Sequence, residues 1–126
     1  MAGITYDTGA LLAAEKGDRA MWAVHKRALE RGIRPTVPAG VLAQAWRGGP
    51  QPALSRFLAG CRFEALTASA SRATGAACAR SRRPDIVDAS VVTGALARED
   101  AVFTSDPADL ATIADAFGRR LVLHAV

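Results

Sequence analysis

The strongest constraint on the fold is a regular alternation between short apolar segments and longer segments of helical character. Apolar strands separated by helices are typical of a parallel sheet that helices cover on both faces. We therefore expect an α/β fold, a three-layer α/β/α sandwich with a central parallel sheet of about five strands and right-handed crossovers. The expected strands are residues 4–7, 36–37, 62–66, 101–104 and 121–126.

Helix boundaries in the sequence are marked by capping residues, prolines and glycines. Asp18 and Ser69 are candidate N-caps, and Pro38 suits the first turn of a helix. The expected helices are residues 9–16, 18–31, 38–47, 52–59, 69–80, 85–98 and 107–117. No low-complexity stretch, long linker or internal repeat interrupts this pattern, so we expect a single domain over residues 1–126.

Composition excludes several classes of protein. Half of the residues are hydrophobic and 22% are charged, as in a chain that buries a core. No apolar run approaches the roughly 20 residues that span a bilayer. The first residues carry Asp7 and no basic region, so we expect no secretory signal. Cys61 and Cys78 lack zinc-type spacing, which favours a reducing, cytoplasmic location without disulfides.

Charged and titratable residues limit the chemistry. The net charge is +4, and only Lys16 and Lys26 among the sixteen basic residues are lysines. Arginine suits forked contacts with phosphate, so an anionic partner and an ordinary solvated surface are both consistent with this charge. His25 and His124 lie far apart and beside no serine or cysteine motif. Any chemistry is therefore expected from carboxylates.

Two aspartates follow predicted strands. Asp7 comes after Ile4-Thr5-Tyr6, and Asp106 comes after the strand at 101–104. Ligands of parallel α/β sheets gather at the carboxyl ends of the strands, so neighbouring strands would bring these two carboxylates together. Each also has a purely structural interpretation. Asp7 suits a turn, and Asp106 suits a helix N-cap because Pro107 follows it.

Two further polar residues stand in apolar helical segments. Asp88 lies in DIVDASVVTGALA, where a buried carboxylate is unfavourable unless an arginine or a cation compensates it. Asp85, three residues earlier, either caps this helix or joins the same site. Gln44 is the single polar side chain of VPAGVLAQA, and it either satisfies a buried carbonyl group or faces the same pocket. Converging carboxylates suit Mg²⁺ or Mn²⁺ and, with arginines nearby, phosphodiester hydrolysis.

Four segments in this order resemble a known family. They are YDTGAL, VPAGVLAQAWRGG, DIVDASVV and VFTSDPADL. The chain resembles the PIN-domain ribonucleases, specifically the VapC-type toxins of VapBC toxin–antitoxin modules, over essentially its whole length. No single segment is highly specific, but the four in this order and spacing are fairly specific.

The resemblance implies a set of site residues. The positions that match the family's metal-site acids are Asp7, Asp88 and Asp106, with Asp109 as an alternative last acid and Thr104 as the accompanying hydroxyl. The family's second acid, usually a glutamate, would fall at Gln44, which brings no charge. We expect Asp85 to replace part of that missing charge. The expected RNA-binding residues are Arg47, which matches a recurrent basic position, together with Arg82 and Arg83.

The function implied by the resemblance is that of an endoribonuclease dependent on Mg²⁺ or Mn²⁺, the toxin of a toxin–antitoxin pair. Its implied partners are RNA, a cognate antitoxin and a second copy of the chain in a homodimer. Apolar side chains available for an interface are Met21, Trp22, Val24 and the region of Trp46, and ordinary core packing is the favoured interpretation of each one taken singly.

Two other functions remain open. A phosphotransfer domain of the receiver or haloacid-dehalogenase type also has a strand-end aspartate. The second aspartate of a dehalogenase-like site would stand at position 9, which is glycine, and no lysine lies on the last strand, where a receiver needs one. The second alternative is a PIN-like module that binds RNA or a protein without cutting, and Gln44 favours it.

Overall fold

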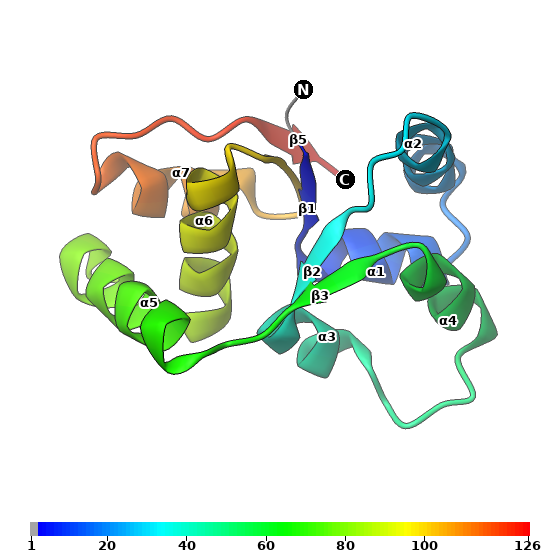
Figure 1. Cartoon of the computed structure of the whole chain (residues 1–126), viewed down its shortest axis with the longest axis horizontal. Coiled ribbons are helices and arrows are strands. Elements are labelled where there is room, and N and C mark those ends of the chain that lie inside the picture. The colour runs from blue at the N-terminus through cyan, green and yellow to red at the C-terminus, as the bar shows by residue number, and fades with distance from the viewer. Residues whose placement is uncertain (1–2) are drawn as a thin grey trace.

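A computed structural model describes residues 3–126 as five parallel strands with helices around them (Figure 1). The strands are β1 (Ile4–Tyr6), β2 (Thr36–Pro38), β3 (Arg62–Glu64), β4 (Ala101–Thr104) and β5 (Leu123–Ala125). They pair in the order β3-β2-β1-β4-β5, and every pair is parallel. The predicted α/β class and the parallel five-stranded sheet are confirmed.

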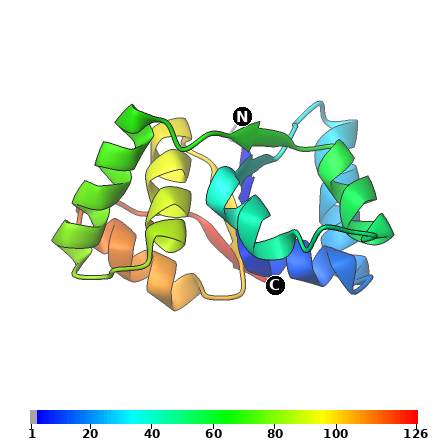
Figure 2. The same ribbon diagram turned by 90° about the horizontal axis from the view of Figure 1, so that it is seen from below.

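Helices flank the sheet on both sides. They are α1 (Thr8–Glu15), α2 (Arg19–Glu30), α3 (Ala39–Ala45), α4 (Pro52–Ala59), α5 (Ala68–Ser81), α6 (Ile86–Arg98) and α7 (Pro107–Asp115). Figures 1 and 2 show α5, α6 and α7 on one side of the strands and α1, α2 and α4 on the other. None of the helices within residues 3–126 combines the length and hydrophobicity that crossing a membrane would require.

Local capping chemistry sets the helix boundaries. Asp18 caps α2 as predicted, since its Oδ1 accepts a hydrogen bond from the backbone N–H of Met21 at 2.9 Å. The predicted cap Ser69 is wrong, because Thr67 Oγ1 accepts from the backbone N–H of Ala70 instead. Pro38 ends β2 and is also the N-cap of α3, one position before the first turn in which it was expected. Its extended backbone pairs in register with β3, and α3 begins at the next residue.

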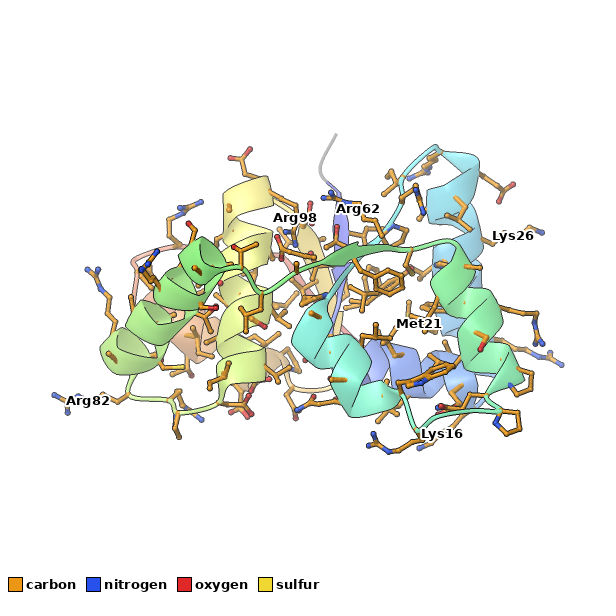
Figure 3. All side chains as sticks on the ribbon, turned by 60° about the horizontal axis from the view of Figure 1, so that its bottom comes forward. Lys16, Met21, Lys26, Arg62, Arg82 and Arg98 are labelled. Atoms are coloured by element: carbon orange, nitrogen blue, oxygen red, sulfur yellow. The ribbon has the colours of Figure 1, made fainter. Side chains whose placement is uncertain are left out.

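Successive residues of β1 serve opposite faces of the sheet, as the alternation of strand side chains requires. Tyr6 is fully buried, and its hydroxyl forms a 2.9 Å hydrogen bond with Nδ1 of His25 on α2. Met21 belongs to this core and is only 3% exposed, so of its two interpretations, interface and core packing, the structure supports core packing. Figure 3 shows Met21 within the molecule rather than on its surface.

On the other face, Thr5 belongs to a polar network that fastens the end of α6 to the sheet. Arg98 donates from Nε to Asp100 Oδ2 and from Nη2 to Thr5 Oγ1, each at 2.9 Å, and it also pairs with Glu64. Thr5 donates to Asp100 Oδ2 at 2.8 Å. Asp100 is 6% exposed, so this network compensates a buried charge. It holds the helix whose first turn carries Asp88.

Candidate active site

The strand-end aspartates meet at one edge of the sheet. Strands β1 and β4 are neighbours, with Tyr6 in register with Phe103. Asp7 follows β1, and its backbone N–H donates to the carbonyl oxygen of Phe103 at 3.0 Å. Asp106 follows β4 and opens α7. The predicted neighbourhood of the two carboxylates thus results from strand order and parallel pairing.

Residues from four segments of the chain line a cavity of about 360 Å³ at this edge. They are Asp7, Thr8, Gly9, Leu12, Gln44, Asp85, Asp88, Ser105, Asp106 and Asp109. The cavity therefore includes each of the predicted acids and Gln44, which comes from the last turn of α3. No lysine or arginine is among its lining residues.

Asp7 is the most enclosed of these acids. It is 4% exposed, and both of its carboxylate oxygens accept hydrogen bonds. The backbone N–H of Thr8 donates to Oδ1 at 2.8 Å, and the hydroxyl of Thr104 donates to Oδ2 at 2.7 Å. The same Thr104 oxygen accepts from the backbone N–H of Asp106 at 2.9 Å. Thr104 therefore fixes the Asp7 side chain and the backbone of Asp106 relative to each other.

Asp85 and Asp106 both stand at helix N-cap positions, but only one of the two carboxylates caps its helix. Asp85 caps α6, because its Oδ1 accepts from the backbone N–H of Asp88 at 3.0 Å. Asp106 stands at the N-cap position of α7, but its carboxylate makes no capping hydrogen bond. The capping interpretation of the Asp106 side chain is thus wrong, and its exposed carboxylate remains available to the cavity.

The electrostatics of the cavity favour uptake of positive charge. Burial raises the pKa of Asp88 to about 6, and the carboxylates of Asp85, Asp7, Asp106 and Asp109 contribute to this rise, in that order of effect. Burial also raises the pKa of Asp7, and hydrogen bonds from Thr104 and Thr8 oppose this. Two carboxylates whose charged forms are disfavoured by burial and by like charges are characteristic of functional sites.

Gln44 makes one side-chain contact that bears on the site. Its Oε1 accepts a 2.6 Å hydrogen bond from the hydroxyl of Thr8. The backbone N–H of Thr8 in turn donates to Asp7, so Gln44 is tied to Asp7 through one intervening residue. Gln44 itself is exposed, so the interpretation in which its amide satisfies a buried carbonyl does not describe it.

The three predicted RNA-binding arginines do not line the cavity. Arg47 is exposed, and its Nη1 donates to the carbonyl oxygen of Trp46. Arg82 ends α5 and points away from the molecule in Figure 3. Arg83 contacts one of the acids, since its Nη1 stands 3.3 Å from Asp109 Oδ1. Both partners of this pair are about half exposed, so it contributes little to stability.

Sequence reasoning missed four residues of the cavity, namely Thr8, Gly9, Leu12 and Ser105. A Cβ atom at Gly9 would stand 2.4 Å from Ser105 Oγ and 2.8 Å from its backbone nitrogen. Glycine at this position therefore allows α1 to approach the end of β4. A glycine in the first turn of a helix was the available signal, because it lowers helix propensity without an evident local reason.

The donor atoms of the cavity suit a divalent cation. Carboxylate and amide oxygens are the ligands that Mg²⁺ and Mn²⁺ prefer, and the raised pKa values indicate negative charge without a basic counterpart. Within residues 3–126, however, no three Asp, Glu, His or Cys side chains stand as a ready metal-binding group. The chemistry of the residues fits a hard cation, and side-chain movement would have to complete the coordination.

Comparison with solved structures agrees with the topology. No family model matches the sequence, and no curated protein matches it significantly. VapBC2 from Rickettsia felis, solved bound to a DNA fragment from its promoter, matches with a TM-score of 0.75 and 14% identity, over 98% of each chain. PAE2754 from Pyrobaculum aerophilum matches with a TM-score of 0.66 and 11% identity, over 97% of this chain and 83% of the other. At these identities the likeness concerns the fold, and this chain has the PIN-domain fold of those two structures.

Proposed function

We propose that this chain is an endoribonuclease dependent on Mg²⁺ or Mn²⁺ that acts as the toxin of a toxin–antitoxin pair. The observation that carries the proposal is the gathering of Asp7, Asp88 and Asp106 around one cavity with no basic residue in its lining. These acids come from the end of β1, the first turn of α6 and the end of β4. The resemblance of the sequence and the fold of the solved neighbours agree with it.

The proposed chemistry is the hydrolysis of an RNA phosphodiester bond. Asp7, Asp88 and Asp106 would hold the cation, with Asp85 and Asp109 at the margin of the cavity. When bound, the cation would supply an activated water and offset charge on the phosphate. The hydroxyl of Thr104 keeps Asp7 in a single orientation. Arg83, at the margin, would exchange its pairing with Asp109 for a phosphate of the RNA backbone.

The proposed partners besides RNA are a cognate antitoxin and a second copy of the chain, and the proposed location is the cytoplasm. Both protein partners rest on the resemblance and on the VapBC2 neighbour. Large apolar side chains on the surface would serve such contacts. Phe63, Leu66 and Ile86 are 51%, 44% and 58% exposed, and Trp46 is 42% exposed.

Cleavage of a mixed pool of structured RNAs tests the proposal. The protein should cut with Mg²⁺ or Mn²⁺ and stop with EDTA, and Asp7→Asn or Asp88→Asn should lower the rate by roughly 100-fold or more. Asp115→Asn is the matched control, because Asp115 is an exposed acid at the other end of α7. Equal cleavage by every variant would indicate a contaminating nuclease and refute the catalytic proposal.

A PIN-like module that binds without cutting remains the second candidate. Gln44 favours it, since an uncharged side chain stands where the family resemblance leads us to expect an acid. Under this alternative the wild-type protein binds RNA but does not cut it, and Gln44→Glu gains cleavage. If the wild type cuts RNA and Gln44→Glu cuts it no faster, the alternative of binding without cleavage is excluded.

A further inference from the structure

Gln44 lines the cavity at the position where the family resemblance leads us to expect an acid. Its contacts indicate a role other than that of a weakened metal ligand. Its amide oxygen is already engaged by the hydroxyl of Thr8 at 2.6 Å. The hydrogen bond from Thr8 engages Oε1 and leaves both N–H groups of Nε2 without a protein acceptor among residues 3–126. Because Gln44 lines the cavity and is exposed, these donors are accessible to a ligand in it.

Two physical reasons support this orientation of the amide. The hydroxyl of Thr8 needs an acceptor, and Oε1 supplies one. The cavity also carries the carboxylates of Asp7, Asp88 and Asp106, so the positive end of the amide dipole is favoured toward it. Thr8 is itself fixed, since its backbone N–H donates to Asp7 Oδ1 at 2.8 Å. The Thr8 hydroxyl thus sets the direction of the Gln44 amide relative to Asp7.

We propose that Gln44 is a substrate-binding residue whose Nε2 group donates a hydrogen bond to a phosphate oxygen of the bound RNA, and that it is not a metal ligand. Thr8 is the positioning residue that fixes its amide. A glutamate at this position would present only acceptors to an anionic phosphate, whereas the amide presents donors. The inference rests on the proposed ribonuclease function and names the residue that holds the substrate at that site.

Metal binding and RNA binding, measured separately, test this assignment. Isothermal titration with Mn²⁺ alone gives the metal Kd, and a fluorescein-labelled single-stranded RNA gives KM and kcat with Mn²⁺ and an anisotropy Kd in EDTA. Gln44→Leu should leave the Mn²⁺ Kd within about twofold and raise KM by roughly tenfold, the effect of losing a hydrogen bond to a charged group. Thr8→Val should act in the same direction by a smaller factor.

The outcomes separate the inference from the ribonuclease proposal. If the Mn²⁺ Kd of Gln44→Leu rises by about tenfold, Gln44 is a ligand and the inference is wrong. Unchanged metal and RNA binding in that variant also overturns it, and Thr8→Val behaving as wild type overturns the positioning role. If the wild type cuts no RNA, the ribonuclease proposal fails. The role of Gln44 in RNA binding is then decided by comparing the anisotropy Kd of the wild type and of Gln44→Leu in EDTA. Thermal melting confirms that each variant is folded, as expected for the exposed Gln44 and the half-buried Thr8.

Discussion

The hydroxyl of Thr104 donates a 2.7 Å hydrogen bond to Asp7 Oδ2 between residues that lie 97 positions apart in sequence. The same oxygen accepts from the backbone N–H of Asp106 at 2.9 Å. Thr104 is fully buried, so neither contact is replaced by solvent. One side chain therefore joins the ends of β1 and β4 and determines how two acids of the cavity face each other.

Thr104→Val should destabilise the protein by about 1–3 kcal/mol, because the buried Asp7 Oδ2 loses its donor and the N–H of Asp106 loses its acceptor. The pKa of Asp7 should rise further, since the bond from Thr104 lowers it in the wild type. Urea denaturation and carboxyl NMR titration measure the two effects. Thr104→Ser keeps the hydroxyl and is the control. A Thr104→Val variant as stable as the wild type would show that the hydroxyl contributes nothing and would contradict the prediction.

Without metal, the contribution of Asp88 to stability should fall as the pH rises from about 4 to above 6. Burial and neighbouring carboxylates raise the pKa of Asp88 from 3.8 to about 6, so the folded protein keeps a proton that the unfolded chain releases. This contribution is fully present below the unfolded pKa and is lost as the pH rises through the folded value. Asp88→Asn should remove it, making the variant more stable than wild type at pH 7 by about 1 kcal/mol or less once solvent screening is allowed for.

Denaturant unfolding at pH 4.5 and pH 7 measures this effect, and Asp115→Asn is the control with a wild-type slope. Other titrating groups change the unfolding free energy equally in all three proteins. The relevant quantity is therefore how much the change in unfolding free energy between pH 4.5 and pH 7 differs between wild type and variant. An identical pH slope for wild type and Asp88→Asn would contradict the expected role of Asp88.

Gly9→Ala should destabilise the protein by about 1–3 kcal/mol, because the new Cβ would meet the side chain and the backbone nitrogen of Ser105. Backbone atoms cannot move aside as a flexible side chain does, so the ends of β1 and β4 would separate. Gly75→Ala is the matched control. Gly75 is exposed in α5, and a Cβ atom added there would meet nothing within 4 Å, so alanine should stabilise by about 0.5–1 kcal/mol. Thermal unfolding of the two variants should therefore shift in opposite directions.

Tyr6→Phe should cost about 1–3 kcal/mol, because it leaves Nδ1 of the buried His25 without its 2.9 Å partner. The ring itself is retained, so its packing against Phe57, at 5.0 Å between ring centroids, is preserved. A double-mutant cycle with His25→Leu isolates the pair, and we expect a coupling energy clearly different from zero. Strictly additive effects would show that the hydrogen bond contributes nothing.

Several features could be predicted from sequence because their causes are local. The alternation of apolar segments and helices depends on periodicity, and Asp18 caps α2 because its own backbone geometry allows it. The acids at strand ends follow from the rule that parallel strands end at one edge. Competing local signals also explain one wrong prediction. Ser69 and Thr67 are both good caps, and only the observed hydrogen bond distinguishes them.

The contacts of the site could not be predicted, because they join residues distant in sequence. Nothing near Arg83 indicates that it lies 3.3 Å from Asp109, and nothing near Gln44 indicates that Thr8 binds its amide oxygen. For Met21 the sequence left core packing and an interface both open, and only the packing of α2 in the tertiary structure decided for the core.

By itself, the sequence determined the kinds of element, their order and the acids that follow the strands, since propensity, capping and apolar patterning act over a few residues. Tertiary structure alone decided that β1 and β4 are neighbours, that Thr104 links Asp7 to Asp106, and that the amide of Gln44 is turned by Thr8. Such relationships depend on side-chain directions after distant segments have packed, and the free energy of that packing belongs to the whole core rather than to any one segment.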